Sequence, residues 1–140
     1  MTDEFLWVPL RSSLRWPLAG LSVISAAAHL PVLSEHLHEV PYIGVEFIVL
    51  IVACLLIAIA APAWDSTALY AVAAITCGLA VAAYIATRAV GFPGLADDVG
   101  NWFEPLGVVA VLAESATVLV AIYVLAQRYS KGQPSIRLRR

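Results

Sequence analysis

The stretch PYIGVEFIVLIVACLLIAIAA, residues 41–61, contains a single charged side chain, Glu46, and decides the class of this protein. Its length matches the ~20 apolar residues that an α-helix needs to cross the ~30 Å hydrocarbon core of a bilayer. Backbone polar groups find no water in that core, so only helices and closed barrels span it. Because the stretch shows no strand-like alternation of apolar and polar residues, we predict a transmembrane helix.

Long apolar stretches also lie before and after residues 41–61. The chain is 61% hydrophobic and only 13% charged, whereas soluble domains are roughly 25% charged. We therefore predict an all-α, four-helix transmembrane bundle that forms a single membrane domain over residues 1–140. The expected spans are about 16–38, interrupted by Pro31, then 41–62, 66–90 and 105–128, followed by a basic tail at 129–140.

Basic residues predict the orientation, since positive charge is retained on the cytoplasmic side. Arg11 and Arg15 precede the first span, and the connections on the opposite side contain no Lys or Arg. We expect both termini to be cytoplasmic and the protein to lie in the inner, or plasma, membrane. The acidic start MTDE is unlike the basic beginning of a signal peptide, so we expect the first span to be retained. The remaining basic residues follow the last span: Arg128, Lys131, Arg137, Arg139 and Arg140.

Judged by depth, one ionisable residue of each predicted span lies within the membrane: His29, Glu46, Arg88 and Glu114. Such a group costs roughly 2.5–3.5 kcal/mol in a membrane and marks a functional candidate. Reckoned at ~1.5 Å of helical rise per residue, all four lie in the outer half of the membrane. The inner half holds no comparable group, which disfavours a path through the membrane and favours a polar pocket open to the outside.

All three histidines fall within AAAHLPVLSEHLHEVP, residues 26–41. On a continuous helix, His29, His36 and Glu39 share one face. Bundles build metal sites from such side chains, and an imidazole and carboxylate set suits zinc, copper or iron. His29 and His36 are about 10 Å apart along the axis, so a shared ion requires a kink at Pro31. The predicted metal ligands are His29, His36, Glu39 and Glu114, and the predicted supporting polar network is Glu35, Glu46 and Arg88.

A second hypothesis is a small accessory subunit of a larger membrane protein complex, whose polar residues form a fixed structural network. Arg88 would then neutralise Glu46 or Glu114. Small residues recur every four positions in the third span and predict a face for close helix packing or self-association. That face comprises Ala74, Gly78, Ala82 and Ala86.

Other functional classes have little support in the sequence. A bis-histidine haem is not expected because all three histidines lie on one stretch. No nucleotide fingerprint and no nucleophile with an adjacent base is present, and nucleic-acid binding is not expected because the basic residues flank the membrane. Whether the protein is an enzyme stays open.

Cys54 and Cys77 both fall in the middle of spans, and their expected heights differ by several Å. We predict that they are unbridged, inert small hydrophobes. The long third connection carries oxygen ligands that suit weak calcium binding, without the spacing of an EF-hand. These residues are Asp97, Asp98, Asn101 and Glu104.

The segments AHLPVLSEH and TRAVGFPG, together with a glutamate in the fourth span, resemble those of a widespread type of small four-span bacterial membrane protein. The resemblance covers nearly the whole chain, but its motifs are short. It implies the four-span fold and no activity. Glu46 departs from the aromatic or apolar residue expected at that position, which puts its role in the site in doubt. The matching positions are His29, Glu35, His36, Glu39, Thr87, Arg88, Gly91, Pro93 and Glu114.

Overall fold

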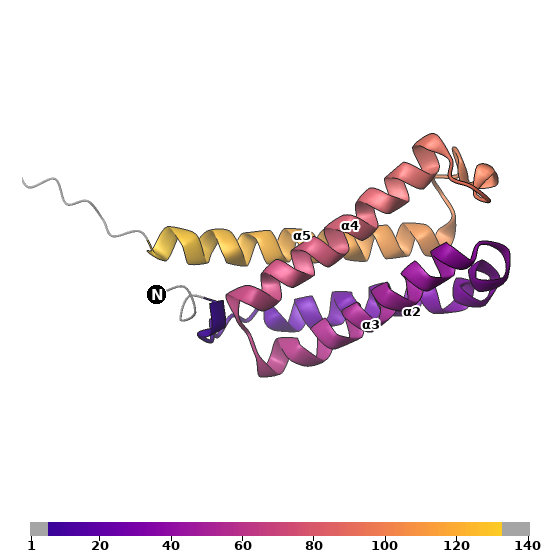
Figure 1. The fold of residues 1–140 in the computed structure, drawn as a ribbon. Coiled ribbons are helices and arrows are strands. Elements are labelled where there is room, and N and C mark those ends of the chain that lie inside the picture. Colours follow the sequence, from indigo (N-terminus) through magenta and orange to yellow (C-terminus); the bar gives the residue numbers. More distant parts are fainter. Residues whose placement is uncertain (1–5, 133–140) are drawn as a thin grey trace, which may run out of the picture.

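A computed structural model describes residues 6–132, in which the chain forms four long α-helices and no strand (Figure 1). The all-α four-helix bundle is therefore confirmed. The first helix continues through Pro31 without ending there, and the last extends past the predicted limit at residue 128. In order, the elements are α2 (Arg15–Glu39), α3 (Pro41–Ala63), α4 (Thr67–Val90), the short 3-10 helix η1 (Ala96–Asp98) and α5 (Pro105–Gly132).

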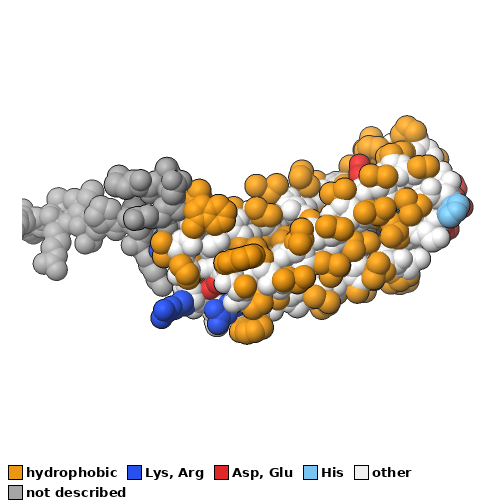
Figure 2. All heavy atoms as spheres, turned by 60° about the horizontal axis from the view of Figure 1, so that its bottom comes forward, with side chains coloured by type: hydrophobic (Ala, Val, Ile, Leu, Met, Phe, Trp, Pro, Cys, Tyr) orange, Lys and Arg blue, Asp and Glu red, His pale blue; other side chains and the backbone are white. Residues whose placement is uncertain are grey.

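All four long helices are long and apolar enough to cross a membrane. Figure 2 shows hydrophobic side chains over the whole length of one face, with basic side chains at one end and histidine at the other. Exposed tryptophans lie near both ends, as expected of anchors at membrane interfaces, among them Trp64 and Trp102. The chain is a multi-pass membrane protein whose outer surface faces lipid.

The helices pack in the order α3, α2, α5, α4, and the weakest contact between neighbours is that of α3 with α4. At the connection between α2 and α3, Gly44 lies so close to Leu37 that an added Cβ would be 2.8 Å from the Cα of Leu37. The absence of a side chain thus lets the two helices pack tightly. We call the end with this connection and with residues 91–104 the histidine end, and the opposite one the terminal end.

At the terminal end, a buried carboxylate ties the segment before α2 to the turn between α3 and α4. Asp65 is 3% exposed. Its side chain accepts hydrogen bonds from the backbone N–H of Ser12 and, at 2.8 Å, from the Tyr70 hydroxyl. Its carbonyl accepts another from the N–H of Leu10 at 2.7 Å. The segment before α2 is therefore anchored to the bundle at Leu10 and Ser12.

At the histidine end, residues 91–104 are held to the helices at several points. The Tyr42 hydroxyl donates to the carbonyl of Pro93 at 2.7 Å, and the Tyr84 hydroxyl to that of Trp102 at 2.9 Å. Asp98 pairs with Arg88, and Glu104 accepts hydrogen bonds from backbone N–H groups in the first turn of α5. Two of the four residues expected to bind calcium thus have structural partners within the chain.

Candidate functional site

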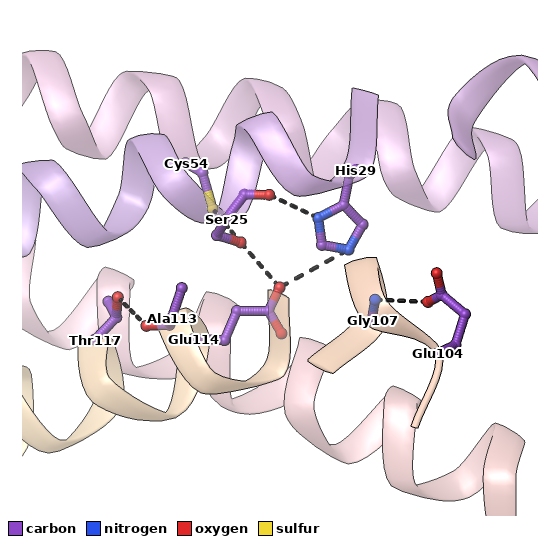
Figure 3. A network of polar contacts seen from close by, with 8 residues as sticks. All are labelled: Ser25, His29, Cys54, Glu104, Gly107, Ala113, Glu114 and Thr117. Atoms are coloured by element: carbon purple, nitrogen blue, oxygen red, sulfur yellow. Dashed lines mark hydrogen bonds and ion pairs between the residues drawn. The ribbon is translucent and has the colours of Figure 1, made fainter. Parts of the chain in front are cut away.

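A chain of polar side chains runs through the centre of the bundle, where the surroundings are otherwise apolar (Figure 3). Every long helix contributes to it, and its members are at most 9% exposed. Such groups are costly in a low dielectric unless they are hydrogen-bonded. We call this set the polar seam. It comprises Ser25 and His29 of α2, Cys54 of α3, Cys77 of α4, and Glu114 and Thr117 of α5.

The seam brings together His29 and Glu114, two of the predicted metal ligands, from helices far apart in sequence. The Nε2 atom of His29 lies 3.9 Å from Oε1 of Glu114. The same Oε1 atom accepts a hydrogen bond from the Ser25 hydroxyl at 2.9 Å. His29 is 9% and Glu114 2% exposed, so the pair is buried in the bundle and does not line the open pocket that the sequence favoured.

The histidine rings are held in one particular orientation. Nδ1 lies 2.8 Å from the carbonyl of Ser25 in His29 and 2.8 Å from that of Val32 in His36. A carbonyl oxygen only accepts hydrogen bonds, so Nδ1 of each ring carries the proton and donates it. In the neutral ring, Nε2 then keeps a free lone pair. In His29 this lone pair faces Glu114 and can take a proton or ligate a metal ion.

Phe47 of α3 connects the two imidazoles. Its ring centroid lies 4.8 Å from that of His29 and 4.8 Å from that of His36. The two histidines therefore share a face of α2, as their spacing predicts, and meet the same aromatic side chain. His36 is half-buried, so it lies between the buried pair and the histidine end.

The other predicted site residues lie elsewhere. Glu35, Glu39 and Glu46 are exposed. Arg88 does not neutralise a glutamate of the bundle. Its guanidinium lies 2.7 Å from the carboxylate of Asp98 in η1, because the connection after α4 folds back over the end of that helix. Within residues 6–132, no three His, Cys, Asp or Glu side chains form a group that could hold a metal ion.

The two cysteines are unbridged, as predicted. Cys54 and Cys77 belong to one buried cluster, are both fully buried, and are both free thiols. Cys54 also donates to the Ser25 hydroxyl at 3.7 Å.

Sequence reasoning missed Ser25 and Thr117 altogether. A hydroxyl costs little in a membrane helix because it can bond to the carbonyl one turn earlier, as Thr117 does with Ala113 at 2.9 Å. The sequence contains one signal for them: each is a small polar residue about one helical turn from an ionisable residue, Ser25 from His29 and Thr117 from Glu114. The small-residue face of α4 is used at least partly inside the chain, since Gly78 lies against Val118 of α5.

These observations rest on this chain alone. In comparisons with known protein families, with curated proteins and with solved structures, the chain matches none.

Proposed function

We propose that this multi-pass membrane protein binds a transition-metal ion through Nε2 of His29 and the carboxylate of Glu114, with His36 as the next ligand. The orientation of the imidazoles carries this proposal. Metal-ligating histidines almost always donate their other ring N–H to a carbonyl or carboxylate, which fixes the tautomer and aims the free nitrogen at the ion. His29 and His36 both have this arrangement.

The distance between the two ligand atoms suits a shared ion. Metal–nitrogen and metal–oxygen bonds are about 2.0–2.2 Å long, so two ligands of one ion are at most about 4 Å apart. Nε2 of His29 and Oε1 of Glu114 are 3.9 Å apart. A small movement of the carboxylate toward the ring therefore allows one ion to contact both.

His36 supplies a further ligand by a change in its ring position. Its Nε2 is free, and its ring contacts the same phenylalanine as His29. For both imidazoles to approach one ion, Phe47 would have to move away from α2, and α2 would have to bend at Pro31, because the two rings are about 10 Å apart along a straight helix. The exposed Glu35, Glu39 and Glu46 take no part in this proposal.

The proposal places the site toward the outside of the cell membrane. His29 and Glu114 lie on the halves of their helices nearer the histidine end. Arg11 and Arg15 mark the terminal end, and positive charge is retained in the cytoplasm. We infer that both termini are cytoplasmic and that metal reaches the pair from the outer side of the inner membrane.

Elemental analysis of the detergent-purified protein tests the proposal, after incubation with zinc, copper or iron and removal of unbound ions. We expect about one ion per chain, lost in His29→Ala and in Glu114→Gln. His38→Ala is the matched control, because that ring is held by the Ser34 carbonyl in the same way but is exposed. Retention of metal by both site variants, or no metal in a folded wild type, would refute the proposal. The seam would then be the structural network of an accessory subunit.

A further inference from the structure

We propose that the groove between α3 and α4 at the terminal end binds one anionic phospholipid, with an acyl chain in the groove and the phosphate at Arg11. Binding there does not depend on the metal site, because His29 and Glu114 lie nearer the histidine end. The groove forms where neighbouring helices have their weakest contact, that of α3 with α4. Figure 1 shows these two helices separating with distance from their connection.

The groove is a hollow of about 330 Å³ with apolar walls. Its volume lies within the range of ligand pockets, about 300–1,000 Å³. One wall is a face of α3, formed at helical spacing by Ala53, Leu56 and Ala60, and the other includes Ala68 and Val72 of α4. The alanines leave open the space that larger side chains would fill.

The dimensions of the groove suit an acyl chain better than a helix. Its lining runs along α3 from position 53 to position 64, which is about 16 Å at ~1.5 Å of rise per residue. That length is roughly one leaflet of a ~30 Å hydrocarbon core. An α-helix is about 10 Å across, and a cylinder of that width occupies 330 Å³ within about 4 Å of its length. A partner helix could therefore only cover the groove, whereas a single acyl chain can lie inside it.

Two tryptophans place one end of the groove at the membrane surface. Trp7 and Trp64 both line the groove and are largely exposed, and Trp64 directly follows the end of α3. Tryptophan is enriched at the level of the lipid headgroups. An acyl chain in the groove therefore has its headgroup beside the connection between α3 and α4.

Arg11 supplies positive charge at this connection. The backbone N–H groups of its neighbours Leu10 and Ser12 both donate to Asp65, which lies between α3 and α4. Asp65 is itself 3% exposed, whereas Arg11 is exposed. Arg15 at the start of α2 adds positive charge at the same end. A guanidinium binds phosphate through paired N–H donors, so a headgroup with a phosphate and a net negative charge fits this position.

The experiment uses the full chain in detergent, titrated with palmitoyl-oleoyl phosphatidylglycerol or with phosphatidylcholine of the same acyl chains. Native mass spectrometry counts the bound lipids. We expect one tightly bound phosphatidylglycerol per chain and weaker binding of phosphatidylcholine. Arg11→Gln should weaken phosphatidylglycerol binding about 5-fold, since a basic residue near anionic lipid contributes about 1 kcal/mol and 1.4 kcal/mol is tenfold. Arg128→Gln is the control, because it removes a basic residue of α5 that does not line the groove.

A second substitution tests the acyl-chain part of the site. Ala60→Phe fills the groove and should weaken binding of both lipids about 10-fold, the effect of a clash that costs about 1.4 kcal/mol. Ala83→Phe is the matched control, because that alanine of α4 is exposed and outside the groove. Unchanged binding in a folded Ala60→Phe variant would refute the proposal.

The wild type alone also tests it. Equal binding of the two lipids, or uptake of several lipids without one tight first site, would show ordinary solvation of the outer surface and refute the proposal. Unchanged phosphatidylglycerol binding in Arg11→Gln would refute it as well. That result can be read even if Ala60→Phe does not fold, because Arg11 has an exposed side chain.

Discussion

Replacing Gly44 by alanine tests the tight contact that brings Phe47 against the imidazoles. An added Cβ would lie 2.8 Å from the Cα of Leu37, a backbone atom that cannot move without shifting α2. Overpacking of this kind costs about 1–3 kcal/mol. Gly20 is the matched control, because nothing lies within 4 Å of a Cβ added there. Both substitutions gain about the same helix propensity, roughly 0.5–1 kcal/mol, which cancels in the comparison.

We therefore expect Gly44→Ala to be about 1–3 kcal/mol less stable than Gly20→Ala. The measurement is reversible unfolding in mixed micelles, followed by the helical circular-dichroism signal as the fraction of denaturing detergent rises. Gly44 precedes Phe47 by one turn, so its variant should also lose metal affinity. Equal stability of the two variants would show that α2 and α3 do not approach as closely as described.

Further variants test the buried charges and the limits of the site. Asp65→Asn should lower the free energy of unfolding by about 1–3 kcal/mol, because charge-assisted hydrogen bonds are lost. Tyr70→Phe, which removes one of those bonds, should cost less, and the reverse order in thermal unfolding would contradict the described anchor. Asp98→Asn should destabilise the protein by leaving Arg88 without its carboxylate, and the added substitution Arg88→Met should restore part of the loss. A double variant less stable than the single one would argue against the pair. Glu46→Leu should leave the metal content unchanged and stability equal or higher, since it removes an exposed charge from a membrane helix. Loss of metal in that variant would show that Glu46 is part of the metal site.

The fold could be predicted from hydropathy because the bilayer core leaves an apolar stretch few ways to satisfy its backbone hydrogen bonds. The stretch from Pro41 to Ala63 has no alternative to a helix that satisfies its backbone in a bilayer. The expected depth of His29 and Glu114 in the membrane also identified them as candidate site residues, because ionisable groups are rare in apolar spans. The sequence could not show that these two face each other, because that depends on how α2 and α5 are rotated about their axes.

Two charged residues, Asp65 and Arg88, have partners that the sequence did not reveal because connections between spans fold back onto the helices. Asp65 lies in the short turn after α3, and the segment before α2 covers it, so that it is buried. Arg88 was given a partner within the bundle, but the chain after it returns to supply Asp98. Hydropathy treats such turns as exposed linkers, so it does not reveal the charges that they bury or pair.

The distribution of the polar seam over all four helices also has a consequence for biosynthesis. Ser25 and His29 lie on the first helix to be made, and Glu114 lies on the last. The carboxylate, the costliest of these groups to place in lipid, therefore enters the membrane only after its hydrogen-bond donor is already there. A chain that stops before α5 lacks the carboxylate of the polar seam, and a complete chain that fails to assemble exposes this carboxylate to lipid. The order of the helices along the chain thus favours pairing of this carboxylate over its exposure to lipid.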